Sequence, residues 1–287
     1  MAGKGAKKHQ GKDSERGEGV TEADVIDVSL NLYPRGAYRR EMMKDLVDMG
    51  VAENLDDADR GIDGYDDPRR FDEAKPIWPR RVGTWNLDAK ATPAHVDFLQ
   101  RLDCDVLLLT EVAPALQLHG YFRHLTRGVM ARGQHWAGIF SRVALAPLPD
   151  PHGASAMARI RDITFCASIL PWRTCGSKAP WVGTNTMEKT KHAVSAIVAR
   201  QPAVWGGDWN HAFEGTERAG SVDGRAVIRR AADELGLLVA TRASRHHLDG
   251  LASIDHIAIP RGWADTGVQH VAAGRLSDHD AYVVEQR

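Results

Sequence analysis

Short apolar blocks alternate with amphipathic stretches along the chain from residue 81 onward. Val82 to Asn86 and Val106 to Thr110 are apolar runs typical of strands buried on both faces, and Thr92-Pro93 between them marks the start of a helix. We expect further strands near 138–141, 159–170, 204–208, 237–241, 254–259 and 281–285, and helices at 92–102, 186–200 and 226–235. Strands that alternate with helices predict an α/β fold.

The first eighty residues have a different texture. Residues 1–20 are rich in Gly, Lys, Glu and Ser and hold almost no apolar side chains, so we expect a disordered tail. Within residues 21–80, apolar residues from Tyr38 to Val47 recur at helical spacing, and Gly50 follows them as a helix stop. The pattern predicts a small helical N-terminal extension at 21–80 and a main α/β domain at 81–287.

Composition restricts the class of protein. The hydrophobic fraction is 43%, and no uninterrupted apolar run approaches the length that spans a membrane, so we expect no membrane insertion. The lysines near the N-terminus have no apolar segment behind them, which argues against a secretory signal and predicts a cytoplasmic protein. For the oligomeric state, we take a monomer as the default.

Cysteine spacing and net charge exclude further classes. Cys104, Cys166 and Cys175 are widely separated, which argues against a disulfide framework and against a zinc ribbon. The formal net charge is -1, so the chain lacks the global basic excess expected of a protein bound permanently to nucleic acid. This weighs modestly against long duplex DNA and hardly against small phosphate esters.

The stretch from Val204 to Asn210, read Val-Trp-Gly-Gly-Asp-Trp-Asn, carries the first candidate chemistry. On an extended backbone, positions two apart face the same way, so Asp208 and Asn210 are expected to meet one cavity. Gly206 and Gly207 are expected to let the backbone bend and a ligand approach closely. A carboxylate that aligns water, beside an amide that donates to an oxyanion, is half of a hydrolytic site. The alternative is a simple turn, since Gly-Asp-x-Asn also suits one.

Polar residues recur at the ends of other apolar strands. Asn86 and Glu111 each end a buried strand, and Asp255 and the pair Asp278-His279 flank two more. Polar residues at several strand ends are how a sheet assembles a site from distant parts of a chain, so this recurrence favours a site over a turn.

The residue types indicate a chemistry. Asn86 and Glu111 offer oxygen ligands without Cys or paired His, which suits Mg²⁺ or Mn²⁺ better than zinc. Asp278 offers a further carboxylate for the metal. His279 offers an imidazole that could donate to a phosphoryl oxygen or leaving group, with Asp255 as the best candidate to orient it. His256 is expected to point away from Asp255 on the same strand, into packing.

Five motifs, in this order and spacing, resemble the endonuclease/exonuclease/phosphatase superfamily. They are Thr84-Trp85-Asn86, Leu109-Thr110-Glu111, Gly207-Asp208-Trp209-Asn210, Ile254-Asp255-His256-Ile257 and Ser277-Asp278-His279. The resemblance covers about Arg81 to Arg287. It implies a four-layer α/β sandwich of two mostly antiparallel β-sheets flanked by helices, and hydrolysis of a phosphoester by in-line attack of water. It identifies 81–287 as the catalytic domain.

The resemblance also implies residue roles. Asn86 and Glu111 match metal-binding residues, and Asp278 matches an acidic residue near the metal. Asp208 matches the residue that positions or deprotonates the water. Asn210 matches the phosphate-binding residue. His279 matches the histidine that stabilises the phosphate or donates a proton, with Asp255 as its orienting partner.

One part of the pattern departs from the family. Many members carry a His or Tyr on the central strand, which here reads Cys166-Ala167-Ser168-Ile169-Leu170-Pro171-Trp172 and has neither. Possible substitutes are His152, Arg159, Arg173 and His211. Arg173, His211 and Trp209 are also the candidates for substrate contact, Trp209 because a tryptophan near the site could stack on a base. The alternative is that such a tryptophan packs in the core, which is commoner, and that Arg173 and His211 are structural or surface residues.

The sequence therefore predicts a divalent-metal-dependent phosphodiesterase, most simply a nuclease acting on DNA or RNA. The first alternative is a phosphomonoesterase or phospholipid-headgroup phosphodiesterase. Ala252-Ser253-Ile254-Asp255-His256 lacks the Trp-Cys-Asp-Arg pattern of inositol phosphatases, which disfavours that branch. The second alternative is a catalytically silent binding module, for which the missing central His or Tyr is the sequence hint.

Overall fold

The structure is a computed structural model that describes residues 78–246, 248, 250–263 and 266–287. The predicted disordered tail at 1–20 and nearly all of the predicted helical extension at 21–80 lie outside the described residues. Trp78 already belongs to the packed domain, because its ring contacts Phe165 with the centroids 6.2 Å apart.

Two six-stranded sheets form the centre of the domain. In spatial order, the first contains β11 (Thr266–Val271), β12 (Ala281–Gln286), β1 (Arg81–Asn86), β2 (Val106–Val112), β4 (His135–Ser141) and β3 (Phe122–Leu125). The second contains β5 (Leu145–His152), β6 (Ser155–Ile160), β7 (Ile163–Ser168), β8 (Val204–Asp208), β10 (Asp255–Pro260) and β9 (Leu237–Val239). One pair in each sheet is parallel, β1 with β2 and β7 with β8. The neighbouring pairs around them are antiparallel, as predicted.

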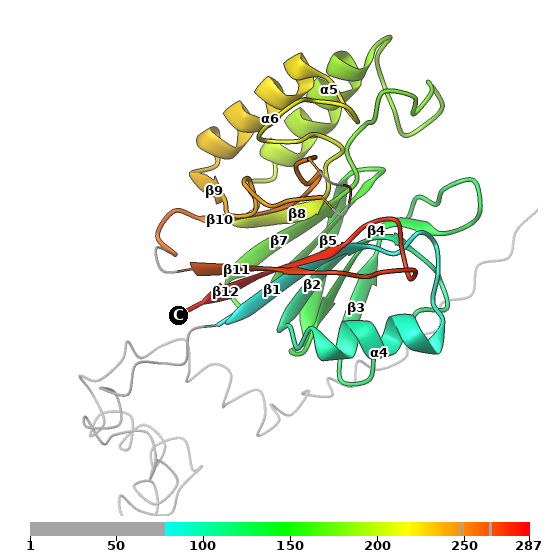
Figure 1. Ribbon diagram of the computed structural model, residues 1–287, viewed down its shortest axis with the longest axis vertical. Helices are drawn as coiled ribbons and strands as arrows, with labels where there is room; N and C mark the ends of the chain where they lie inside the picture. The colour runs from blue at the N-terminus through cyan, green and yellow to red at the C-terminus, as the bar shows by residue number, and fades with distance from the viewer. Residues whose placement is uncertain (1–77, 247, 249, 264–265) are drawn as a thin grey trace, which may run out of the picture. The chain divides into compact units, whose positions relative to one another are not determined.

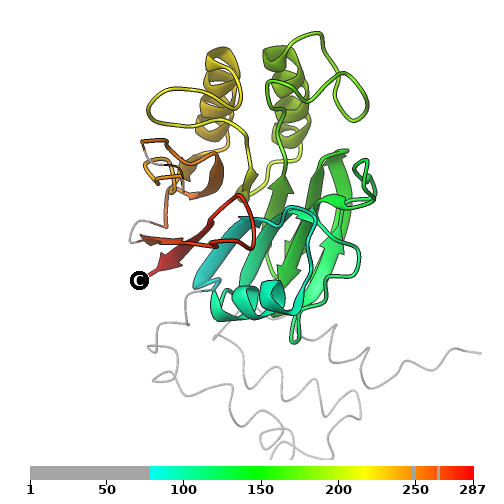
Figure 2. The same ribbon diagram turned by 45° about the vertical axis from the view of Figure 1, so that its right-hand side comes forward.

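Helices cover the outer face of each sheet. In Figures 1 and 2, α4 (Pro93–Arg101) lies against the first sheet, and α5 (Thr186–Val198) and α6 (Val222–Glu234) lie side by side against the second. The order helix, sheet, sheet, helix confirms the predicted four-layer sandwich. Among the described residues, none of the helices has the length and hydropathy of a membrane-spanning segment.

Side-chain alternation along the central strands explains the layers. On β1, Trp85 packs against Phe98 of α4, whereas Val82 packs between the sheets. On β8, Trp205 joins the core beneath α5 and α6, whereas Val204 faces the first sheet. Each such buried side chain contributes about 1.5–3 kcal/mol of hydrophobic stabilisation. Because both faces of these strands are buried, their sequences are continuous apolar runs.

The prediction of one strand at 159–170 was wrong. The segment holds the end of β6, a turn, and then β7, which pairs antiparallel with β6. Arg161 occupies the turn with a left-handed φ of 54°. The helix predicted at 226–235 begins earlier, at Val222, because the side chain of Ser221 accepts a hydrogen bond from the backbone N–H of Gly224 and caps it.

Candidate active site

The polar residues at the strand ends meet at one edge of the two sheets. Asn86 ends β1 and Asp208 ends β8, and both continue the face of their strand that looks toward the other sheet. The amide Nδ2 of Asn86 donates to Oδ2 of Asp208 at 3.0 Å, so this contact joins the first sheet to the second. Both side chains are buried, with 1% and 3% exposure.

Glu111 reaches the same point through an unusual backbone conformation. Its φ is 49°, in the left-handed region that a residue with a Cβ rarely adopts. Asn86 Nδ2 lies 3.3 Å from Oε1 of Glu111 and donates to it. Left-handed residues at functional sites persist only where the surrounding structure holds them. The sequence signal for Glu111 was its place after four apolar residues, and the conformation that turns it toward Asn86 was not visible there.

Asn210 lies beside Asp208, but the alternation of side chains along an extended strand does not explain this position. Strand β8 ends at Asp208, and Asn210 takes a left-handed φ of 52°. The backbone N–H of Asn210 donates to Oδ1 of Asp208 at 3.0 Å, and its side-chain Nδ2 donates to the carbonyl of Leu170 at 3.1 Å. The two residues are therefore brought together by a turn after the strand. The predicted extended backbone through Asn210 was wrong.

The glycine pair before Asp208 makes room for protein rather than for a ligand. A Cβ on Gly206 would lie 2.8 Å from both the carbonyl of His256 and a methyl group of Leu108. A Cβ on Gly207, whose φ is 127°, would lie 2.2 Å from the carbonyl oxygen of Ser168. These glycines let neighbouring strands and the facing sheet pack closely, so the expected approach of a ligand at this pair is wrong.

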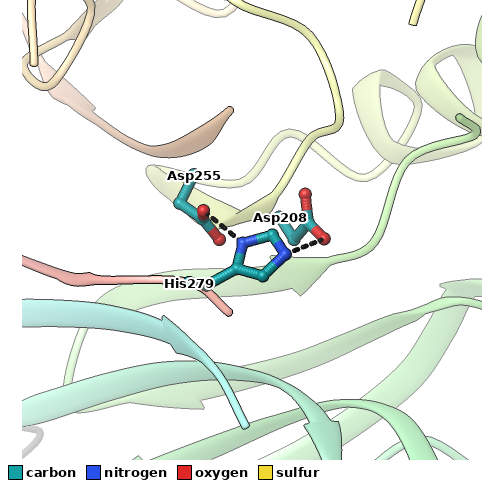
Figure 3. Close-up of side chains that lie close together, drawn as sticks. All are labelled: Asp208, Asp255 and His279. Carbon is teal, nitrogen blue, oxygen red and sulfur yellow. Dashed lines mark hydrogen bonds and ion pairs between the residues drawn. The ribbon is translucent and has the colours of Figure 1, made fainter. Parts of the chain in front are cut away.

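His279 lies between two carboxylates (Figure 3). Its Nδ1 is 2.7 Å from Oδ2 of Asp255, and its Nε2 is 4.0 Å from Oδ2 of Asp208. Asp255 opens β10 and pairs in register with Asp208 on β8, which places both carboxylates on one face of the second sheet. Asp278 lies at the rim with 75% side-chain exposure, and its Oδ1 is 4.0 Å from Nε2 of His279.

Two residues that the sequence marked only as motif members hold His279 in place. The indole Nε1 of Trp85 donates to the carbonyl of His279 at 2.9 Å. Ser277 Oγ donates to the carbonyl of Asn86 at 2.7 Å and accepts from the N–H of His279 at 3.1 Å. The segment before β12 is thus tied to the end of β1. In the sequence, the signal for this contact was the serine two residues before the site histidine.

Burial and charge shift the acid–base behaviour of the site. Burial, and then the charge of Asp255, raises the pKa of Asp208. Burial also raises the pKa of Glu111. Burial alone would lower the pKa of His279, but the carboxylates of Asp255 and Asp208 outweigh it and raise that pKa well above its usual value. At neutral pH His279 therefore carries a proton that it can donate.

The chemistry of the donors fits a hard divalent cation. The carboxylates of Glu111, Asp208, Asp255 and Asp278 gather around the imidazolium of His279, so negative charge is in excess. Oδ1 of Asp255 is buried and has no hydrogen-bond partner among the described residues. Asp208, Asp255 and His279 each offer one ligand atom within 4.8 Å of the others, but the raised pKa of His279 leaves the carboxylates as the donors available to a cation. Oxygen donors and excess negative charge are what Mg²⁺ or Mn²⁺ requires.

Of the three residues predicted to contact substrate, two are buried in the core and one is exposed. Trp209 is 0% exposed and packs with Trp205, Phe213 and His256 beneath the helices, so the expectation that it stacks on a base was wrong. His211 is also 0% exposed, and its Nδ1 donates to the carbonyl of Trp209. Trp209 lies in the turn after Asp208, and His211 comes directly after that turn. The side chains of both enter the core. Arg173 is exposed, and its backbone N–H donates to the carbonyl of Ala219.

The remaining candidate substitutes for the central-strand histidine lie elsewhere. His152 is buried, and its ring nitrogens bond the carbonyl of Pro180 and the N–H of Ala154. Arg159 pairs with Thr164 near the start of β7, at the opposite end of that strand from Ser168. As expected, His256 points away from Asp255, and its Nε2 donates to the carbonyl of His211 at 2.9 Å.

The family follows from a match over most of the domain. Residues 83–279, more than half of the chain, match the model of the Endonuclease/Exonuclease/phosphatase family. The chain belongs to this family. Members of the Endonuclease/Exonuclease/phosphatase family are divalent-metal-dependent hydrolases, mostly nucleases or phosphatases, so the coarse activity is hydrolysis of a phosphate ester. No curated protein matches the sequence.

Solved structures share the fold of this family member. The endonuclease domain of TRAS1, a telomere-specific non-LTR retrotransposon, is 16% identical with a TM-score of 0.53, over 73% of this chain and 99% of that one. The AP endonuclease LMAP from Leishmania major is 14% identical with a TM-score of 0.54, over 72% of this chain and 87% of that one. At these identities the likeness shows the fold alone.

Proposed function

We propose that the chain is a divalent-metal-dependent phosphodiesterase, and that its substrate is DNA or RNA. The observation that carries this proposal is the direct bonding of Asn86 to both Glu111 and Asp208, with the His279–Asp255 pair beside them. Residues from both sheets thus line one edge. Two similar folds belong to proteins named as endonucleases, which favours a nucleic acid over a small phosphate ester.

Asp208 is the residue that we assign to the attacking water. Its raised pKa makes it a stronger base than an ordinary carboxylate, and a general base works best when its pKa lies near the working pH. The N–H of Asn210 fixes one oxygen of this carboxylate, and Asn86 fixes the other. The carboxylate is therefore oriented before substrate arrives, which lowers the entropic cost of reaching the transition state.

His279 is assigned to the phosphoryl group. Asp255 accepts from Nδ1 and holds the ring, so Nε2 is the nitrogen that faces Asp208 and the reacting phosphate. As a cation it stabilises the charge that develops on the phosphoryl oxygens, or donates its proton to the leaving oxygen. Asn210 has a second N–H on its side-chain amide beyond the one bonded to Leu170, and we assign it to a phosphate oxygen.

Asn86, Glu111 and Asp278 are the residues that we propose to hold the cation. When bound, Mg²⁺ or Mn²⁺ supplies charge neutralisation at the phosphate. We favour this set over Asp208, Asp255 and His279, because the raised pKa of His279 keeps a proton on Nε2 as well as on Nδ1, and a protonated ring nitrogen has no lone pair for a metal. We also propose that residues 81–287 form the catalytic domain.

A substrate panel tests the proposal. The purified chain is incubated with supercoiled plasmid, single-stranded DNA, single-stranded RNA, bis-p-nitrophenyl phosphate and p-nitrophenyl phosphate, each with Mg²⁺, with Mn²⁺ and with EDTA. We expect metal-dependent cleavage of a nucleic acid that EDTA abolishes. Turnover of the monoester alone would indicate a phosphomonoesterase, and no turnover of any substrate would indicate a silent binding module.

A further inference from the structure

The loop between β8 and α6 contains a carboxylate buried inside it. Glu217 lies in this loop with only 1% of its side chain exposed. Its neighbours on either side are exposed to solvent: Glu214, Gly215, Thr216 and Arg218. A carboxylate loses favourable hydration when it is buried, so an acidic side chain turned inward from a surface loop needs specific partners.

The partners of Glu217 are backbone groups at the two ends of the loop. Oε2 accepts from the N–H of Ala212 at 3.0 Å, and Oε1 accepts from the N–H of Gly220 at 2.9 Å. The Nε of Arg225, on the first turn of α6, lies 3.7 Å from Oε2. Arg225 Nη1 also donates to the carbonyl of Gly215. One carboxylate therefore closes the loop upon itself and ties it to the helix.

This closed loop is joined to Asn210 along two routes. Along the chain, Ala212 comes two residues after Asn210. Through space, the carbonyl of Ala219, next to Gly220, accepts from the N–H of Arg173 at 2.7 Å. The same segment presents the carbonyl of Leu170 to the side-chain Nδ2 of Asn210 at 3.1 Å. The contacts of Glu217 therefore hold both the backbone that leads out of Asn210 and the segment that its amide binds.

The end of the loop and the start of α6 pack tightly around His211. The buried ring of His211 lies where side chains at Gly220 and Gly224 would stand, since a Cβ on either would come within 2.4 Å of Nε2. Asn210 itself has a left-handed φ of 52°. A left-handed residue with a Cβ is strained, and it relaxes when the contacts around it are lost.

We propose that Glu217 is a positioning residue that fixes the backbone and the side-chain amide of Asn210 in the active site. This inference rests on the proposed function of Asn210 in binding the substrate phosphate. Glu217 does not touch the reacting atoms. It acts through Ala212, Gly220 and the 170–173 segment.

The test compares Glu217→Gln with Glu214→Gln. The first change keeps the volume but replaces one acceptor oxygen with an NH₂ that faces an N–H donor. The second makes the same change on an exposed side chain of the same loop. We expect Glu217→Gln to lower kcat about 10- to 100-fold, since small misplacements of catalytic groups cost this much, with KM changed less than about threefold. Glu214→Gln should stay within about twofold of wild type.

A double mutant separates positioning from a general loss of folded protein. In an Asn210→Ala background, Glu217→Gln should cause a smaller fold-loss of kcat than in the wild-type background, because the side-chain amide that it positions is already absent and only the backbone N–H remains. An equal fold-loss in both backgrounds would overturn the proposal. Wild-type kcat in Glu217→Gln with an intact fold would also overturn it.

A spectroscopic readout keeps the proposal independent of activity. In ¹H–¹⁵N spectra, we expect Glu217→Gln to shift the side-chain NH₂ signals of Asn210 and to speed amide exchange at Ala212 and Gly220. Unchanged Asn210 signals would overturn the positioning role, whatever the activity assays show. If Glu217→Gln does not fold, Arg225→Gln replaces it, because that change leaves both backbone bonds of Glu217 and should move the same signals less. A wild-type chain that cleaves no nucleic acid would instead refute the proposed function.

Discussion

The two sheets have the same order of parallel and antiparallel neighbours but supply different chemistry. In the first, β1 and β2 form a parallel pair joined through α4, and β4 then β3 continue the sheet beyond β2. In the second, β7 and β8 form a parallel pair joined through α5, and β10 then β9 continue it beyond β8. Asn86 and Ser168 thus end matching strands. The shared strand order places the ends of matching strands at corresponding positions in the two sheets. The side chain at each end then determines the chemistry at that position.

At those matching ends the side chains differ in direction as well as in type. Asn86 faces the other sheet and bonds two carboxylates. Ser168 faces the helices, where its Oγ accepts from the indole Nε1 of Trp205 at 3.0 Å. The second sheet contributes its acidic groups one and two strands further along, on β8 and β10. The first sheet is assigned to the cation and the second to the attacking water.

The sharpest test of this division removes the groups beside the reacting phosphate. We expect Asp208→Ala and His279→Ala each to lower kcat/KM at least about 1,000-fold, because a general base or a charge-stabilising donor is lost. Asp233→Ala, which removes an exposed carboxylate on α6, is the control. Metal-dependent turnover on a nucleic acid is measured, with circular dichroism to verify folding. If both site variants turned over at the wild-type rate, the assignment of the site would be wrong.

The next largest effect is expected on the cation side. Glu111→Gln should raise the concentration of Mn²⁺ needed for half-maximal activity by about 10- to 100-fold, because one charged oxygen donor becomes neutral. Activity should partly return at high Mn²⁺, whereas Asp208→Ala should not recover. A metal titration of each variant measures the difference. An unchanged metal requirement in Glu111→Gln would remove the first sheet from cation binding.

Acid should weaken the edge of the second sheet through His152. Burial lowers the pKa of His152 to about 4, although its bond to the carbonyl of Pro180 opposes that shift. As pH falls from about 6.5 to 4, the unfolded chain takes up a proton that the folded chain refuses, so stability is full above this window and declines within it. The loss is at most about 3 kcal/mol.

His152→Gln is the variant that isolates this effect, because the glutamine side chain does not titrate. Urea unfolding at pH 7.5, 6, 5 and 4 gives the comparison with wild type. The free energy of unfolding should fall less steeply with acid in the variant. Parallel pH profiles for the two proteins would show that His152 does not take part.

The smallest expected effect is at Ser168, the counterpart of Asn86. Ser168→Ala should leave kcat/KM within about twofold of wild type and lower the free energy of unfolding by about 1 kcal/mol, because Trp205 loses its hydrogen-bond acceptor. Parallel activity and urea-unfolding measurements test both parts. A large loss of activity would mean that β7 contributes to the site directly, and that the two sheets differ less than their side chains indicate.

The sequence predicted the central strands and the residues at their ends for a physical reason. Strands buried on both faces must be apolar throughout, so a polar residue such as Asn86 or Asp208 directly after one stands out. The edges of the sheets lack this signal. Strand β5 carries Pro147, Pro149 and Pro151, which argue against a strand, but an edge strand tolerates prolines because its outer N–H groups need no partner.

Conformations after the strand ends could not be predicted. The direction of Glu111, which lies within β2, and the burial of Trp209, in the turn after β8, both depend on left-handed residues, Glu111 and Asn210, that are not glycine. The role of Glu217 was equally hidden, because an acidic residue in a polar loop usually faces water. The position of Glu111 depends on contact with Asn86, 25 residues away, whereas the burial of Glu217 depends on a loop that folds back on itself.

The placement of β12 affects the order in which the protein becomes functional during synthesis. This strand lies between β11 and β1, so the first sheet is incomplete until residues made late in translation pair with residues made early. His279 comes two residues before β12 begins at Ala281. A nascent chain, or one truncated by a premature stop codon before this point, lacks the imidazole and leaves one side of β1 without its neighbour. Such fragments are expected to be inactive, so activity should require that β12 has been made and has paired with β1.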